Sequence, residues 1–300
     1  MSKLLTIALI GLGCQLIDGA LGMAYGATTT SLLLAAGIAP AVASASVHLA
    51  ELGTTAASGA AHARLGNVDW KTALPLVIPG AIGGFLGAVV LSSISTDVAA
   101  PFMAGILCLL GVYVLLRFSV LGAPPALRGE GKRLPRAFLV PLGLFGGFID
   151  ASGGGGWGPV CTPALLSTGR LEPRKVIGSV DTSEWFVALG ASIGFIFSLG
   201  GEQLDWTVVG GLMLGGIIAA PLAAWIVRFL PPRILGAAVG GLIVFTNVNT
   251  IADALGFQDV GTWILRAVVV AAWAAALTVA VRAIRRDAAD AAPAGAVSAA

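Results

Sequence analysis

The sequence predicts an all-α membrane protein that crosses the bilayer several times and contains two inverted copies of one segment. Hydrophobic residues make up 57% of the 300 positions, charged residues only 11%, and the mean hydropathy is +0.95. A chain of this length with so little polar surface cannot close a water-soluble globule. A near copy of the residues around position 18 recurs 132 positions later. Together with the placement of the basic residues, these observations define the predicted fold.

The repeated segment has an acidic residue followed by glycines and an aromatic residue. The matched pairs are Asp18 and Asp150, Gly22 and Gly154, Tyr25 and Trp157, and Gly26 and Gly158. Further along the chain, at offsets of 133 and 136, Glu51 matches Glu184 and Trp70 matches Trp206. Such small shifts in offset over a long stretch are what a duplication followed by loop changes would leave.

Residues 1–117 form the predicted first repeat. The apolar runs at 4–17 and 23–36 are each about 14 residues long, whereas a full crossing needs roughly 20. We therefore expect two half-helices that form a re-entrant hairpin over 4–36. Its non-helical tip must be buried in protein or line a wet cavity. Full spans are predicted at 40–63, 70–92 and 97–117.

A polar, basic and Pro/Gly-rich stretch at 118–136 is the predicted linker to the second repeat, which covers 137–252. The second repeat opens with a hairpin over 137–168. Its spans are expected at 173–198, 204–227 and 233–252, with an extra span at 262–284. The alanine-rich residues 285–300 are predicted to be disordered.

The basic residues predict the orientation of the chain. Each repeat crosses the membrane an odd number of times, so the two copies must be inverted. Fifteen of the seventeen Lys and Arg residues fall in or beside the linker, the C-terminus and the loops on their side of the membrane. By the positive-inside rule, we expect the linker 118–136 and the C-terminus to be cytoplasmic in a multi-pass plasma-membrane protein.

The predicted site lies near the membrane midplane, where the hairpin tips meet two helices with a polar face. One of these helices, 40–63, carries His48 and Glu51 on that face. The tips present backbone amides and glycines that a small anion can approach closely. The aromatic residues after the tips either gate the cavity or pack in the core. The candidate binding residues are Gly22, Tyr25, Gly26, Ser46, His48, Gly154, Trp157, Gly158 and Ser179.

Four acids in the same region are the candidate coupling residues. Asp18 and Asp150 lie at the tips, where each is either a helix N-cap or a coupling group. Glu51 and Glu184 each lie eleven residues after a proline, about 16 Å into a core of about 30 Å. A carboxyl group at that depth either holds and releases a proton or is a neutral acid bonded to a carbonyl. His48 either pairs with an oxyanion when protonated or satisfies Glu51 when neutral.

The paired motifs resemble the sulfite exporter TauE/SafE family of membrane transporters. The similarity lies in Ile-Asp-x3-Gly-x3-Gly in both halves, in Ser46-Val47-His48-x2-Glu51 and Ser179-Val180-x3-Glu184, and in the loop Gly66-Asn67-Val68-Asp69-Trp70. The similar region covers about residues 5–250. The resemblance implies export or uptake of sulfite or a related sulfur-containing anion, such as an organosulfonate or thiosulfate. It also implies a bacterial inner membrane as the setting.

From these features we expect a secondary transporter of a small sulfur oxyanion that works by alternating access and is coupled to protons. We expect no catalytic residue, no bound metal and no cofactor. Nucleic acid is excluded as a partner because the basic clusters sit between apolar runs. The alternative is a cation channel or cation-coupled carrier with the four acids as ligands. A third hypothesis is a membrane enzyme using Cys161 and His48, although no base lies near Cys161 in the sequence.

Overall fold

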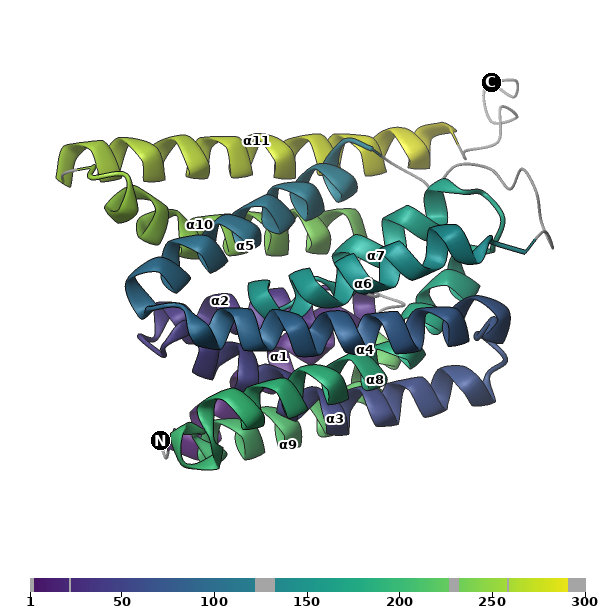
Figure 1. The fold of residues 1–300 in the computed structure, drawn as a ribbon. Helices are drawn as coiled ribbons and strands as arrows, with labels where there is room; N and C mark the ends of the chain where they lie inside the picture. The colour runs from purple at the N-terminus through teal and green to yellow at the C-terminus, as the bar shows by residue number, and fades with distance from the viewer. Residues whose placement is uncertain (1–2, 22, 122–132, 227–231, 258, 291–300) are drawn as a thin grey trace, which may run out of the picture.

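The computed structural model describes residues 3–21, 23–121, 133–226, 232–257 and 259–290, and over these ranges its secondary structure is entirely helical. The long helices run roughly along one common direction (Figure 1). The elements are α1 (Lys3–Leu21), α2 (Tyr25–Ala35), α3 (Pro40–Arg64), α4 (Trp70–Ser93), α5 (Thr96–Ser119), α6 (Arg136–Gly153), α7 (Trp157–Ser167), α8 (Pro173–Leu199), the 3-10 turn η1 (Gly201–Gln203), α9 (Trp206–Ile226), α10 (Pro232–Ala254) and α11 (Asp259–Asp290).

Five helices in the described ranges are long and apolar enough to cross a membrane. They are α4, α5, α8, α10 and α11, and α9 adds a shorter apolar stretch over Trp206–Ala220. The predicted all-helical, multi-pass membrane protein is therefore confirmed.

The central helix α3 covers the predicted span 40–63 but is not among these five. Its polar face lowers its hydropathy, and that face is turned inward. His48 is 0% exposed and Glu51 is 1% exposed. α3 packs against α8 and α9, so the polar stripe faces protein, as expected.

Helices from the two halves of the chain pack against each other. α1 lies along α9, α4 lies along α6, α3 packs on α8, and α5 packs on α10. Glycines allow the closest of these contacts: a Cβ at Gly83 of α4 would collide with the Leu144 carbonyl of α6. In the same way, a Cβ at Gly215 of α9 would collide with the Ala8 carbonyl of α1. These small-residue ridges let the helix backbones approach each other without a side chain between them.

The two predicted hairpins break later than expected. α1 has 19 residues and α6 has 18, so Asp18 and Asp150 lie within helices rather than at turns. The shorter α2 and α7 have 11 residues each. The prediction ended each first half-helix at its acid, because the acid interrupts the apolar run. In the structure α1 continues past Asp18 to Leu21, and α6 continues past Asp150 to Gly153. Gly154 and Gly155 have φ of 76° and 137°, a backbone that favours glycine.

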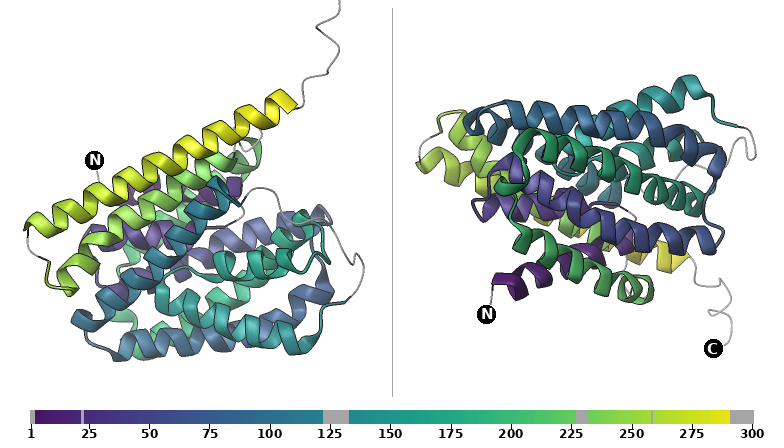
Figure 2. Two further views of the ribbon diagram at one scale, coloured as in Figure 1. Left: turned by 90° about the horizontal axis from the view of Figure 1, so that it is seen from above. Right: turned by 60° about the horizontal axis from the view of Figure 1, so that its bottom comes forward.

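The C-terminal helix α11 lies along the outer side of α10 (Figures 1 and 2). It ends at Asp290, beyond the predicted span 262–284. The prediction of disorder from 285 was therefore wrong for residues 285–290, whose alanines favour helix. Residues 291–300 lie outside the described residues, as do 122–132 of the predicted linker.

Candidate functional site

Each helix break is capped by the acid of the helix before it. Asp18 Oδ1 accepts a hydrogen bond from the Tyr25 backbone N–H at 3.0 Å. Asp150 Oδ1 accepts hydrogen bonds from the backbone N–H groups of Gly156, at 2.6 Å, and Trp157, at 2.9 Å. A carboxylate in this position satisfies amides that the next helix leaves unpaired and balances its positive end. Each acid therefore caps the following helix, as one of the two interpretations of the sequence proposed, but from the preceding helix, because Ala24 and Gly156 occupy the N-cap positions themselves.

The two breaks lie directly against each other. A Cβ on Gly26 of α2 would be 2.7 Å from the Cα of Gly155. A Cβ on Gly155 would in turn overlap the backbone of Gly26 and Ala27. The Thr30 hydroxyl donates a hydrogen bond to the carbonyl of Gly154, which holds the two breaks together. Because a side chain at either glycine would separate these backbones, the contact depends on glycine.

Three buried side chains converge beside this contact. His48 and Glu51 come from α3 and Asp150 comes from α6, and each is at most 1% exposed. His48 Nε2 lies 3.1 Å from Asp150 Oδ2. One possible ligand atom of each residue lies within 4.8 Å of the other two. Glu51 Oε1 is 3.2 Å from where a Cβ of Gly26 would lie, which places the cluster next to the break of α2.

The imidazole of His48 is held from both sides. Its Nδ1 lies 2.8 Å from the Ser44 carbonyl, which can only accept, so Nδ1 carries a hydrogen. Nε2 faces Asp150: it donates when Asp150 is ionised and accepts when Asp150 is protonated. The Ser44 hydroxyl donates to the Ala151 carbonyl at 2.7 Å, which fastens α3 to α6. The ring of Phe195 packs against the imidazole with centroids 5.9 Å apart.

Glu51 has a buried oxygen with no bonding partner. Its Oε2 makes no hydrogen bond with any of the described residues. The carboxyl groups of Asp18, Asp150 and Glu184 are close enough to interact electrostatically with that of Glu51. A buried carboxylate oxygen without a donor is costly, so a proton or a cation at this position would relieve the cost.

The two aromatic residues after the breaks are packed in the core. Tyr25 belongs to an apolar cluster, and its hydroxyl has no partner among the described residues. Trp157 is fully buried, and its Nε1 donates to the Val180 carbonyl at 3.0 Å. This conformation therefore places both rings in the packing role, the second of the two predicted alternatives.

The two candidate serines make hydrogen bonds elsewhere. The Ser46 hydroxyl donates to the Val42 carbonyl of its own helix. The Ser179 hydroxyl accepts a hydrogen bond from the Asp69 backbone N–H at 2.8 Å and so braces the turn before α4.

The other candidate residues are described by their helix and their burial. Gly158 is buried in the first turn of α7, and Glu184 is half-buried on α8. Gly22 lies outside the described residues. Cys161 is buried against Gly146, with its Sγ 2.8 Å from where a Cβ of that glycine would lie.

Three residues outside the predicted binding and coupling residues hold the site together. Gly155 and Thr30 form the contact between the breaks. Asn247 of α10 is 1% exposed and donates from Nδ2 to the Ser31 hydroxyl at 2.7 Å. An amide in the middle of an apolar span is itself a signal, because a polar group there must be satisfied within the protein.

A comparison with protein families matches residues 7–250 to the family described as sulfite exporter TauE/SafE. The chain belongs to the sulfite exporter TauE/SafE family. The resemblance of the paired motifs is thereby confirmed, and the matched region agrees with the predicted 5–250.

Two similar proteins of Bacillus subtilis (strain 168) are each described as a probable membrane transporter protein. YtnM is 57% identical to this chain over 253 residues, which is 84% of each protein. YdhB is 27% identical over 192 residues, which is 64% of this chain and 77% of YdhB. No solved structure matches the chain significantly. The chain is accordingly a membrane transporter of the TauE/SafE family.

Proposed function

We propose that the protein carries a small sulfur-containing anion, such as sulfite, an organosulfonate or thiosulfate, across the membrane by alternating access coupled to protons. The observation that carries the proposal is the contact between the two capped helix breaks beside the buried His48, Glu51 and Asp150. The family description, which names sulfite, supports the substrate class.

Two inverted repeats, 1–117 and 137–252, would supply the moving parts. The helix packing is reciprocal: α4 of the first half lies on α6 of the second, and α9 of the second lies on α1 of the first. The carboxylate caps on Tyr25 and Trp157 recur at the same sequence offset. Both features support a pseudo-two-fold relation, which lets the halves exchange conformations as the site opens to each side.

The linker and the C-terminus are proposed to be cytoplasmic in a bacterial inner membrane. In support, Arg133 and Arg136 from the linker end lie around one pocket with Lys71 from the start of α4. Basic residues from separate loops thus gather at one end of the bundle, as the positive-inside rule requires for a cytoplasmic surface.

The amides at the helix breaks are the proposed anion-binding groups. In this conformation Asp150 holds the amides of Gly156 and Trp157. A carboxylate accepts such bonds far more strongly than a neutral carboxylic acid does. Protonation of Asp150 would release the amides to an oxyanion, so that the proton and the anion are taken up together. Asp18 would act in the same way on the amide of Tyr25.

His48, Glu51 and Glu184 form the proposed proton path to Asp150. An imidazolium at His48 would pass its Nε2 hydrogen to Asp150 Oδ2 across 3.1 Å and become neutral. Glu51, on the same face of α3, would return a proton to His48. Glu184 interacts electrostatically with Glu51 and is half-buried, so it would exchange protons with the solution on one side.

Two features favour a second candidate, a cation channel or cation-coupled carrier. An imidazole nitrogen and two carboxylates within 4.8 Å form a donor set that suits a divalent transition metal. The hydrogen bond from His48 Nδ1 to a carbonyl is also the usual support of a metal-binding histidine. In a cation channel or cation-coupled carrier, the buried acids would bind the cation instead of carrying protons.

Counterflow in proteoliposomes of the purified protein separates the two candidates. Labelled sulfite, thiosulfate, sulfate and a small sulfonate are offered at two pH values. The anion proposal predicts saturable exchange of the reduced sulfur anions or the sulfonate in preference to sulfate. Transport of a cation with no oxyanion present, together with no exchange of any anion by folded protein, would contradict it.

A further inference from the structure

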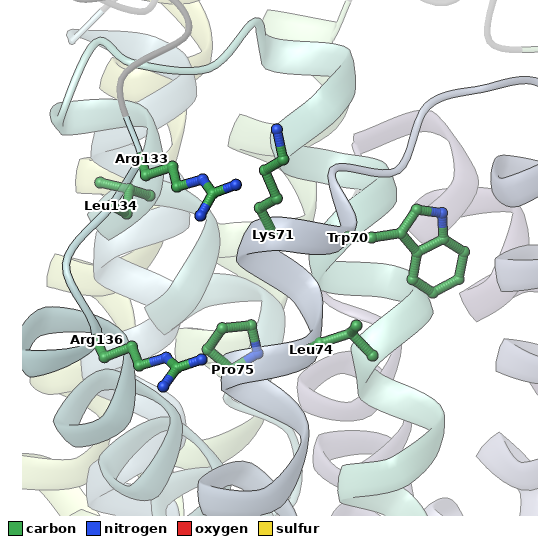
Figure 3. Close-up of a pocket in the computed structure, with 7 residues that line it drawn as sticks. All are labelled: Trp70, Lys71, Leu74, Pro75, Arg133, Leu134 and Arg136. Carbon is green, nitrogen blue, oxygen red and sulfur yellow. The ribbon is translucent and has the colours of Figure 1, made fainter.

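A groove on the outer surface of α4 and α6 joins a cationic pocket to an apolar channel, away from the helix breaks. The cationic pocket has a volume of about 420 Å³, and Lys71, Arg133 and Arg136 surround it together with Trp70 (Figure 3). The apolar channel, of about 460 Å³, shares Leu74, Pro75 and Arg136 with the pocket. The two cavities therefore form one continuous groove.

The three cations of this groove are exposed and available to a ligand. Lys71 lies in the first turn of α4, Arg136 begins α6, and Arg133 precedes it by three residues. Figure 3 shows Arg133, on the segment before α6, extending toward Lys71 of α4, and Arg136 extending toward Pro75. Within the described part of the chain, none of the three forms an ion pair with an acid. Three like charges so close together repel one another unless an anion lies between them.

The apolar channel follows α4 into the membrane. Leu74, Ile78 and Ile82 are 58%, 69% and 50% exposed and lie one helical turn apart. Val140 of α6, which is 44% exposed, lines the opposite side. Ile82 follows Trp70 by twelve residues, or about 18 Å along the helix, in a hydrocarbon core of about 30 Å. The groove thus has about the depth of one leaflet.

We propose that this groove binds an anionic phospholipid, with its phosphate among Lys71, Arg133 and Arg136 and one acyl chain along α4 and α6. Guanidinium groups match the geometry of phosphate oxygens, and basic pockets between spanning helices suit anionic headgroups. The exposed indole of Trp70 stands at the level where aromatic residues anchor a span in the interface. A free phosphate would fill only the cationic pocket, and a zwitterionic lipid would leave the excess positive charge unbalanced.

Native mass spectrometry of the purified full-length protein in detergent tests this site with phosphatidylglycerol and phosphatidylcholine of the same acyl chains. Replacing the three cations together, Lys71→Gln, Arg133→Gln and Arg136→Gln, should weaken phosphatidylglycerol binding about tenfold or more. The matched control replaces three exposed arginines of α11 with Gln, at Arg282, Arg285 and Arg286. The control should bind phosphatidylglycerol as the unmodified protein does.

A second variant, Ile78→Trp, fills the apolar channel and leaves the cations in place. It should weaken phosphatidylglycerol binding, whereas excess inorganic phosphate should compete poorly with the lipid for the unmodified protein. Equal binding of the two lipids, unchanged binding by the triple variant, or full displacement by inorganic phosphate would each overturn the proposal. A lipid with a photoreactive acyl chain should label residues 74–82 or 136–140; labelling elsewhere would also overturn it.

Discussion

The two helix breaks have matching residues in the sequence, 132 positions apart, but differ in what surrounds their acids. In both copies the acid caps the helix that follows, Asp18 through Tyr25 and Asp150 through Trp157. Asp150 has two further contacts, a second amide at Gly156 and the imidazole of His48. Asp18 is only half-buried and has no histidine partner among the described residues.

The difference originates in the helices that carry the polar stripes. At the position of His48, the second copy has Asp181 on α8. Asp181 accepts hydrogen bonds from the Ser58 hydroxyl of α3, with both oxygens at 2.9 Å. Both breaks therefore have a carboxylate cap, whereas only the acid of the second break, Asp150, has an imidazole partner among the described residues. Proton chemistry is accordingly expected at the second break. One pair of variants, at Asp150 and Asp18, tests that expectation, and three further pairs compare the stability contributions of residues at the two breaks.

The largest effect is expected at the contact between the breaks. Gly155→Ala should destabilise the protein by about 3–5 kcal/mol, because its Cβ overlaps the Gly26 backbone and its φ of 137° strains any other residue. Gly26→Ala, with an ordinary φ, should cost about 1–3 kcal/mol. Melting temperatures in detergent measure both.

Gly37→Ala is the control for these two variants, since it has a positive φ of 82° in open space. It should cost only about 1 kcal/mol. A cost at Gly155 no greater than that at Gly37 would mean that the breaks do not press against each other.

The second-largest effect is expected when the two capping acids are replaced. Asp150→Asn should lower proton-driven uptake by about 100-fold, because it removes the charge that binds two amides and His48. Asp18→Asn, which affects one amide, should lower uptake by about tenfold. Initial rates in proteoliposomes with an imposed pH gradient give both values. Equal losses would show that the breaks are functionally equivalent.

The aromatic residues after the breaks should differ more modestly. Trp157→Phe removes the hydrogen bond to Val180 and leaves a void, so it should cost about 2–3 kcal/mol. Tyr25→Phe should lie within about 0.5 kcal/mol of the unmodified protein, because the hydroxyl has no partner in the described part of the chain. A large loss of stability on Tyr25→Phe would reveal a bond to that hydroxyl.

The smallest difference is expected between two equivalent threonines. Thr30→Val removes the hydrogen bond to Gly154 and should cost about 1 kcal/mol. Thr162→Val should be neutral, since the Thr162 hydroxyl has no partner among the described residues. Thermal melting under identical detergent conditions distinguishes the two variants. A larger loss of stability for Thr162→Val than for Thr30→Val would contradict the hydrogen bond between Thr30 and Gly154.

Features of the fold that lie in local pattern were predictable from the sequence. The repeat places Asp18 and Asp150 at equivalent positions, and a spacing of three or four residues identifies the buried face that holds His48 and Glu51. Helix ends were less predictable, because the apolar run stops at Asp18 whereas α1 continues to Leu21. Periodicity and composition report which face is buried but not where a turn begins.

Contacts between distant segments were not predictable from one sequence. His48 and Asp150 are 102 positions apart, and Thr30 and Gly154 are 124 apart. From the sequence alone, each of these side chains could have several partners, and only the packing of α3, α6 and the two breaks determines which one it has. The sequence likewise offered Ser46 and Ser179 as site residues, although each hydroxyl is bonded to backbone outside the His48 cluster.

Whether protons move with the anion is the most direct test of proton coupling in this transporter. Proteoliposomes containing a pH-sensitive dye receive a gradient of thiosulfate or a small sulfonate, anions whose own charge is constant near neutral pH. If protons and the anion move together, anion flux through the unmodified protein changes the internal pH. Glu51→Gln should leave anion exchange largely intact but abolish the pH change. Anion flux with no pH change in the unmodified protein, or an undiminished change in Glu51→Gln, would contradict the proposed coupling.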